Sequence, residues 1–574
     1  MSPGGSPISW SIKKKIREAL SLERGTVYKE HGGRLRLALV YPNTYGVGMA
    51  NLGFQSVYML ANDMEDCACE RAFLPDKDAL LEHERTGTSL LSYESQTPLA
   101  DFDIIAFAIP FEEDYSNVPR ILSLAGISPM AAERRGRGPL IAAGGVGVSL
   151  NPEPLADFMD FFLIGEAEGS LRPVLEDIGK GIETGRGRDE TLEALDSFIW
   201  VYVPSFYEFT YEGAAIREIR PRPNAKPLVR AAKAMDVNGL PVPRSFVYAP
   251  GTEFKETYCL EVERGCGKGC RFCAAGFLYL PPRMRERGAV AEAMDEGMAR
   301  AGKVGLVGAA VSEYPEIKEL LKKGIGKEAT VTLSSLRLDE LDEGFLSLLK
   351  EAGYRTITLA PEAGTERMRD IINKGITDAE IMEAVRLISE AGLRRVRLYF
   401  MVGLPGEADE DVQGIIDLSI NIRKALRGGE VNLSLNPFVP KPCTPFQWHP
   451  FAPLEVIEKR MSRVKKALGK AGITVRDLPA KEAFVQAYLS RADRRAGRII
   501  EAASQKGWKR AIRGQEEFVG ESVFHPRGRG DVLPWDMIDH GIKKDYLWKE
   551  YQKGLAGKTT PPCIVGKCTR CGVC

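Results

Sequence analysis

The chain has 574 residues, with 78 Lys and Arg balanced by 78 Asp and Glu, so its formal net charge at pH 7 is zero. This balance excludes a protein that attracts nucleic acid through a global positive field, although it does not exclude a local basic patch. The length predicts several domains. No run of about 18 apolar residues could span a bilayer, and the start of the chain lacks the apolar centre of a signal peptide, so we expect a cytoplasmic protein.

The first part of the chain is predicted to hold one parallel α/β domain. Residues 1–35 form a helical extension, and residues 36–180 alternate β-rich runs such as LRLALVYP and DIIAFAI with helical stretches. Short β-rich runs bounded by Gly or Pro predict βαβ units in a doubly wound, Rossmann-like sheet. Residues 181–245 follow as a hairpin that turns at a Glu-Gly pair and a Pro-rich connector.

A second α/β unit is predicted at residues 246–460. Its strand candidates are TYCLEVERG, KVGLVGAAV, TVTLSSL, TITLAPEA, RVRLYFMVG and VNLSLNPFV, with helical patterns between them. Six β/α units are fewer than a closed barrel needs, so we expect a partial, TIM-type (β/α)6 barrel whose strand ends face a cavity. Residues 461–555 are predicted to be helical and charged. Their basic stretches at 465–470 and 490–498 are either solvated helix faces or contacts for RNA phosphates.

Three cysteines lie within eight residues directly after the first barrel strand. Cys266, Cys270 and Cys273 have the spacing C-x3-C-x2-C. A structural zinc site closes with four ligands, whereas three thiolates leave one iron of a 4Fe–4S cluster without a protein ligand. Glycines around the cysteines would let backbone amides approach the sulfurs, and Arg271 would add positive charge near an anionic centre. The alternative is a zinc knuckle or three incidental cysteines.

With the aromatic Phe272 before the last cysteine, this motif resembles the hallmark of the radical S-adenosylmethionine (SAM) superfamily. The resemblance implies that the open iron binds the amino and carboxylate groups of SAM. It further implies that an electron from the cluster breaks a carbon–sulfur bond to give a 5'-deoxyadenosyl radical, and that a reduced partner such as flavodoxin or ferredoxin supplies the electron.

The same resemblance implies further SAM contacts at the ends of the later barrel strands, and each has an ordinary barrel loop as its alternative. The acidic residue that the family usually places after the second strand is missing from GLVGAAV. No catalytic residue for the substrate step is assigned. The predicted SAM-contacting residues are Phe272, Gly308, Ser335, Arg337, Glu362 and Gly403.

The N-terminal domain resembles the cobalamin-binding domain fused ahead of some radical SAM barrels. Glycines at strand ends, with Gly144 and Gly145 as the candidates, would let cobalamin lie close to the backbone. Cobalamin-binding domains in which a histidine binds the cobalt carry the motif D-x-H-x-x-G, and this motif is absent here. The histidines of this region are His31 and His83. Cobalamin would therefore bind without a protein ligand to cobalt, or the sheet has another role.

A second cysteine cluster lies in the segment 556–574. Cys563, Cys568, Cys571 and Cys574 have the spacing C-x4-C-x2-C-x2-C. Consecutive C-x2-C steps favour a second iron–sulfur cluster, whereas zinc ribbons usually separate two C-x2-C pairs. A structural zinc site and a disordered tail with unbound thiols remain the alternatives.

These features together resemble an uncharacterised branch of the superfamily. The leading prediction is a radical SAM enzyme, a cobalamin-dependent methyltransferase that acts on an unactivated carbon of an unknown small molecule, peptide or RNA. Alternatives are a cobalamin-independent radical modification, methylthiolation of RNA, and a non-catalytic iron–sulfur or zinc scaffold. Methylthiolation is weakened because the N-terminal domain offers only Cys67 and Cys69 for a second cluster.

Overall fold

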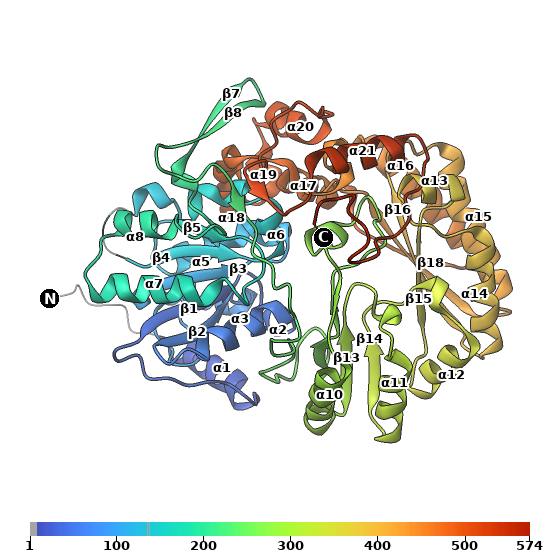
Figure 1. Cartoon of the computed structure of the whole chain (residues 1–574), viewed down its shortest axis with the longest axis horizontal. Helices are drawn as coiled ribbons and strands as arrows, with labels where there is room; N and C mark the ends of the chain where they lie inside the picture. Colours follow the sequence, from blue (N-terminus) through green and yellow to red (C-terminus); the bar gives the residue numbers. More distant parts are fainter. Residues whose placement is uncertain (1–8, 135, 137, 574) are drawn as a thin grey trace.

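The computed structural model describes residues 9–134, 136 and 138–573. Two α/β regions lie side by side, an N-terminal one in blue and cyan and a larger one in green, yellow and orange (Figure 1). Within the described residues, no helix is both long and apolar enough to cross a membrane.

The N-terminal region is a six-stranded sheet in the order β2-β1-β3-β4-β5-β6. The first five strands are parallel, and β6 pairs antiparallel at the edge. The strands are β1 Leu35–Tyr41, β2 Cys67–Phe73, β3 Ile104–Ala108, β4 Leu140–Gly144, β5 Phe161–Leu163 and β6 Val201–Tyr202. Because the strand order reverses between β1 and β3, their carboxyl ends flank the crevice where open α/β sheets bind ligands.

Helices from two distant parts of the chain cover this sheet. Helix α3 packs beside α7, and α5 packs beside α18, which comes from the C-terminal third of the chain. The bounds are α1 Trp10–Ser21, α3 Leu52–Asn62, α5 Asn117–Leu124, α7 Leu171–Glu183 and α18 Gly497–Lys506. The doubly wound fold is confirmed, and the predicted hairpin is present as antiparallel β7 (Tyr207–Glu212) and β8 (Ala215–Pro221).

The second region contains the six predicted barrel strands, all parallel to their neighbours. Together with a seventh strand, β18, they form two ladders, β10-β13-β14 and β15-β16-β17-β18, with helices on the outer side (Figure 1). The strands are β10 Tyr258–Glu261, β13 Lys303–Val307, β14 Thr330–Leu333, β15 Ile357–Glu362, β16 Arg395–Val402, β17 Glu430–Pro437 and β18 Thr474–Asp477. The helices are α10 Arg287–Ala301, α11 Ile317–Gly326, α12 Glu343–Glu351, α14 Asp378–Glu390, α15 Asp409–Ala425 and α16 Leu454–Lys470. The open barrel is confirmed, while β18 adds a parallel strand within the segment that we predicted to be helical.

Helix α17 (Ala480–Arg491) contacts both regions, since it packs against residues Glu112–Ser116 after β3 and against β17. The further helices are α2 Tyr45–Met49, α4 Lys77–Thr86, α8 Arg188–Leu195, α13 Glu366–Ile371, α19 Trp508–Ile512, α20 Glu516–Phe524 and α21 Lys544–Leu555. Two arginines of the basic stretch 490–498 point inward rather than toward a ligand. Arg491 is 1% exposed and donates to the carbonyl oxygens of His449 and His525, and Arg494 pairs with Glu153 at 2.8 Å. An RNA contact through these two side chains is therefore wrong, because the interior of the fold uses their charge.

Candidate cluster site and shared cavity

The three cysteines of the C-x3-C-x2-C motif lie together in the loop between the short strand β11 (Glu263–Arg264) and helix α9 (Ala274–Leu278), which we call the cluster loop (residues 265–273). Each thiol is partly buried, and burial raises the pKa of all three. The backbone N–H of Lys268 donates to the sulfur of Cys266, and that of Gly276 donates to Cys273. The predicted approach of backbone amides to the sulfurs is therefore present.

Positive charge reaches these sulfurs from Lys374, which follows α13, and from Arg337, which follows β14, and not from Arg271. Burial raises the pKa of Cys270, and the nearby cations of Lys374 and Arg337 lower it. Arg271 is fully buried, and its guanidinium donates to the Glu550 carboxylate at 3.1 Å and to the Lys558 carbonyl at 2.6 Å. The predicted role of Arg271 beside the cluster is therefore wrong, because its side chain leaves the loop toward α21 and the segment that follows it.

Glu362 occupies the most unusual backbone position near the cysteines. It ends β15 at a shift in strand register, and its φ is +68°. A left-handed conformation costs about 1 kcal/mol for such a residue, and strain of this kind is concentrated at functional sites. Its carboxylate lies 3.6 Å from the Lys374 ammonium; burial raises its pKa and Lys374 lowers it. The SAM contact of Glu362 stays a prediction, and no local motif in the sequence indicated Lys374 beside it.

The other predicted SAM residues have partners within the protein. The Ser335 hydroxyl donates to the Gly308 carbonyl at 3.1 Å and accepts from the Val311 amide at 2.9 Å, so it joins the loops after β13 and β14. The Gly403 amide donates to the Glu407 carboxylate at 2.7 Å. These residues shape the ends of the strands.

An acidic side chain does lie near Gly308, although it comes from a different strand than we expected. Glu263, which begins the short strand β11 (Glu263–Arg264), accepts a hydrogen bond from the Ala310 amide just beyond Gly308. Burial raises the pKa of Glu263 to about 7. Sequence reasoning looked for this carboxylate after the second barrel strand and therefore missed it.

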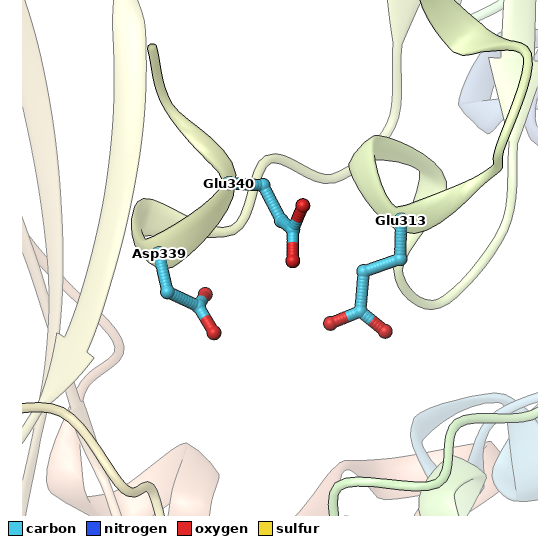
Figure 2. Close-up of side chains that lie close together, drawn as sticks. All are labelled: Glu313, Asp339 and Glu340. Atoms are coloured by element: carbon cyan, nitrogen blue, oxygen red, sulfur yellow. The ribbon is translucent and has the colours of Figure 1, made fainter.

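Three carboxylates also converge beside the cluster loop, and Figure 2 shows them facing one another. The oxygens of Glu313, Asp339 and Glu340 lie within 4.8 Å of one another. Two protein cations are already bound to this group. Lys268 of the cluster loop lies 2.6 Å from Glu313, and Arg337 lies 2.9 Å from both Glu313 and Asp339. The group therefore acts as an ion-pair network that holds the cluster loop and Arg337 in place.

A cavity of about 480 Å³ lies where the N-terminal sheet meets the barrel. Phe111 and Glu113, which follow β3, line one side. The other side is lined by Phe272 of the cluster loop, Met401 of β16 and Phe438, which directly follows β17. We call this space the shared cavity. A larger cavity of about 830 Å³ lies between the β7–β8 hairpin and α20, and none of the predicted site residues lines it.

The predicted cobalamin residues lie at the same end of the N-terminal sheet, but their backbone packs against protein. Gly145 has φ +111°, and a Cβ there would lie 2.7 Å from the Ile109 carbonyl oxygen, so glycine is needed to bring β3 and β4 together. His31 pairs with Glu70, and His83 bonds the Thr88 carbonyl. Both histidines are therefore engaged by other groups.

The second cysteine cluster lies against the first. Cys563, Cys568 and Cys571 line one small cavity together with Cys266 of the cluster loop. The fourth predicted ligand, Cys574, lies outside the described residues.

Two family models match the chain. One, described as the N-terminal region of radical SAM proteins, matches residues 53–204, and one described as the radical SAM superfamily matches residues 260–419. An uncharacterised protein of Methanocaldococcus jannaschii is 29% identical over 471 residues, which is 81% of this chain and 90% of that protein. The anaerobic magnesium-protoporphyrin IX monomethyl ester cyclase of Cereibacter sphaeroides is 28% identical over 160 residues, 26% of each protein.

Among solved structures, the cobalamin-dependent SAM radical enzyme OxsB with aqua-cobalamin bound has a TM-score of 0.43 at 15% identity, covering 67% of this chain and 52% of OxsB. The two family models describe one superfamily and together span more than half of the chain. With three clustered cysteines after the first strand of an open barrel, this chain belongs to the radical SAM superfamily, which implies a 4Fe–4S cluster and SAM as cofactors.

Proposed function

We propose that this chain is a cobalamin-dependent radical SAM enzyme that transfers a methyl group to an unactivated carbon. In this proposal, Cys266, Cys270 and Cys273 bind the 4Fe–4S cluster. When bound, the cluster supplies one electron that breaks the C5'–S bond of SAM, which releases methionine and a 5'-deoxyadenosyl radical able to take hydrogen from a substrate. A reduced flavodoxin or ferredoxin would supply the electron, and a cytoplasmic location would keep the thiols reduced.

The cluster loop fits an anionic group held by three thiolates. Two backbone amides donate to its sulfurs, and the charges of Lys374 and Arg337 offset the negative charge that burial disfavours. In this proposal Glu362 accepts hydrogen bonds from the ammonium group of SAM, which is supported by its strained backbone and by the nearness of its carboxylate to Cys270. In this proposal Phe272, Gly308, Ser335 and Gly403 shape the wall against which SAM lies.

The shared cavity is the observation that carries the methyl-transfer proposal. The carboxyl end of β3, at the ligand-binding crevice of the N-terminal sheet, and Phe272, next to Cys273, line the same space. A group held at the crevice and a radical formed at the barrel would thus meet at one substrate. An enzyme that used the barrel alone would have no need of this shared space.

The lining of the cavity fits the broad face of a corrin. Phe111, Phe272, Phe438 and Met401 present flat or flexible apolar surface, and Lys441 closes one edge through an ion pair with Glu112 at 2.7 Å. Because His31 and His83 are bonded elsewhere, we propose that cobalamin binds without a protein ligand to cobalt. The predicted contacts with Gly144 and Gly145 are not part of this proposal, because both glycines pack against protein and neither lines the shared cavity.

Methylthiolation of RNA receives no support from the described residues. Cys67 and Cys69 are fully buried in β2, and burial raises the pKa of both thiols. They do not form a cluster site at the surface of the N-terminal domain.

The test is an anaerobic assay of the reconstituted, reduced protein with SAM. We expect 5'-deoxyadenosine by mass spectrometry, a corrinoid absorbance in the purified protein, and S-adenosylhomocysteine alongside 5'-deoxyadenosine once substrate is present. Cleavage of SAM without corrinoid would favour a cobalamin-independent radical reaction. If the protein neither cleaves nor binds SAM, the enzyme proposal is overturned and a non-catalytic scaffold is favoured.

A further inference from the structure

The segment 556–573, which we call the cysteine tail, has too little apolar burial to order itself. Of its larger apolar side chains, Ile564 is 61% exposed and Val565 is 52% exposed, whereas Cys571 is 4% exposed. The segment contains no helix or strand. Fixing a backbone without burying apolar surface is unfavourable, so the cysteine tail requires another source of order.

The cysteine tail binds the backbone of the cluster loop directly at Gly267, and through the side chain of Asn373 at Lys268 and Gly269. The Cys563 amide donates to the Gly267 carbonyl at 2.7 Å. The Asn373 side chain accepts from the Thr560 amide at 2.8 Å and donates to the carbonyls of Lys268 and Gly269. Arg271 adds its bond to the Lys558 carbonyl. The conformation of the loop that carries Cys266 and Cys270 therefore depends on where the tail lies.

The thiols of the tail converge on the same place. Cys563, Cys568 and Cys571 line a cavity of about 20 Å³ with Cys266, whereas Cys270 and Cys273 do not line it. An alanine at Gly267 would place its Cβ 3.1 Å from the Cys563 carbonyl oxygen and 3.5 Å from the Cys563 Cβ, so only the loop backbone separates the two cysteine clusters. Arg570 donates to the Cys568 sulfur at 3.1 Å and to the carbonyls of Pro561 and Pro562.

We propose that Cys563, Cys568 and Cys571 hold a second thiolate-bound metal centre directly behind the cluster loop, and that this centre locks the cysteine tail onto the loop. Metal–thiolate bonds supply the order that apolar burial does not, as in other small metal-folded segments. A metal held there fixes Cys563 and, through its amide, the carbonyl of Gly267. Three thiolates fit an iron–sulfur cluster with one open iron, whereas a structural zinc ion would need a fourth ligand in addition to them.

The first experiment removes the barrel site, so that it does not depend on the proposed enzyme activity. The triple variant Cys266→Ala, Cys270→Ala, Cys273→Ala is prepared anaerobically, and its iron, sulfide and zinc are measured with Mössbauer spectroscopy for iron. We expect either about four iron and four sulfide per chain, or about one zinc. Adding Cys568→Ala and Cys571→Ala should lower the metal to background, whereas adding Cys67→Ala, a buried thiol far along the chain, should not.

The second experiment needs no substitution. Trypsin is added to the wild-type protein before and after treatment with a strong chelator, and cleavage after Lys558 and Lys567 is followed by mass spectrometry. We expect cleavage at least about ten times faster after chelation, because the tail opens when its metal leaves. The proposed centre would be overturned if the triple variant contained no metal. It would also be overturned if trypsin cleaved the cysteine tail equally fast before and after chelation.

The third experiment tests whether the metal centre of the cysteine tail stabilises the cluster loop. In a chain with intact barrel cysteines, the double variant Cys568→Ala, Cys571→Ala should retain iron at the barrel but lose it to a chelator about ten times faster than the Cys67→Ala control. An unchanged rate of loss would overturn the coupling between tail and loop, and it would do so whether or not the protein cleaves SAM.

Discussion

The N-terminal sheet and the barrel both direct the carboxyl ends of parallel strands at the shared cavity, yet the two ends differ in chemistry. At the sheet, polar groups are paired internally, as Asn43 is with Asp114 at 2.8 Å, and Phe111 faces the cavity. At the barrel, Glu362 adopts a left-handed backbone beside Lys374 and the cysteines. The comparison teaches that similar strand ends can present an aromatic surface whose polar groups are largely paired internally, or a charged surface with a strained backbone.

The largest expected effect is at the barrel. Cys270→Ala should remove iron from the cluster loop and lower formation of 5'-deoxyadenosine at least about 1,000-fold, because the cluster loses one of three thiolates. Metal analysis and mass spectrometry measure both. The matched control is Cys259→Ala, a buried thiol within β10, which should keep its iron. If Cys270→Ala cleaved SAM as fast as the wild-type protein, the assignment of the 4Fe–4S cluster to the cluster loop would be wrong.

A smaller loss is expected when the strained carboxylate is neutralised. Glu362→Gln should lower kcat/KM for SAM about 10- to 100-fold, since a hydrogen bond to a charged group contributes about 1.5–3 kcal/mol. The control is Glu410→Gln, an exposed carboxylate in the first turn of α15. Equal kinetics in the two variants would show that Glu362 does not contact SAM.

A substitution on the sheet side should separate the two ends of the cavity. Phe111→Ala should leave SAM cleavage within about twofold but lower methyl transfer about tenfold, because the group held by the sheet loses a wall of its binding site. The ratio of S-adenosylhomocysteine to 5'-deoxyadenosine measures this. Phe254→Ala, at a phenylalanine that is 53% exposed and does not line the cavity, serves as the control. If S-adenosylhomocysteine and 5'-deoxyadenosine decreased by the same factor, the proposed separation of methyl transfer at the sheet from SAM cleavage at the barrel would be wrong.

The last effect is on stability and not on activity, and it concerns the contact of the C-terminal segment with the N-terminal region. His540, which follows β19 (Ile538–Asp539), bonds the Ser149 carbonyl of α6 (Val146–Leu150) through Nε2 at 2.8 Å. Burial and the charge of Lys233 lower its pKa to about 4, below the ordinary 6.5. Protonation of His540 therefore favours unfolding. The free energy of unfolding is unaffected by the titration of His540 above pH 6.5, and it decreases by about 3 kcal/mol in total as the pH falls to about 4.

His540→Gln should consequently reduce the acid dependence of Tm between pH 6.5 and 4, by up to a few degrees, with little change at pH 8. The control is His525→Gln, whose side chain is 63% exposed. If both variants lose Tm with acid as steeply as the wild-type protein, His540 does not titrate in folding.

Local patterns predicted more of the fold than of the site. The six barrel strands and the Glu-Gly hairpin followed from short β-rich runs between turn residues. The strand β18 was missed because it has four residues, of which Thr474, Arg476 and Asp477 are exposed, so it lacks an apolar run. Glu263 was missed because its carboxylate reaches Gly308 from a neighbouring strand. Arg271 was misplaced because adjacency in sequence does not determine where a side chain points.

By itself, the sequence determined that three thiols lie within one loop after a strand, because spacings of three and two residues cannot separate them far. It also determined the two parallel α/β regions through the periodicity of apolar residues. Only the tertiary structure decided that Phe111 shares a cavity with Phe272, and that Cys563 lies against Gly267. Contacts between residues so far apart in the chain depend on how whole elements pack, and no local pattern encodes that packing.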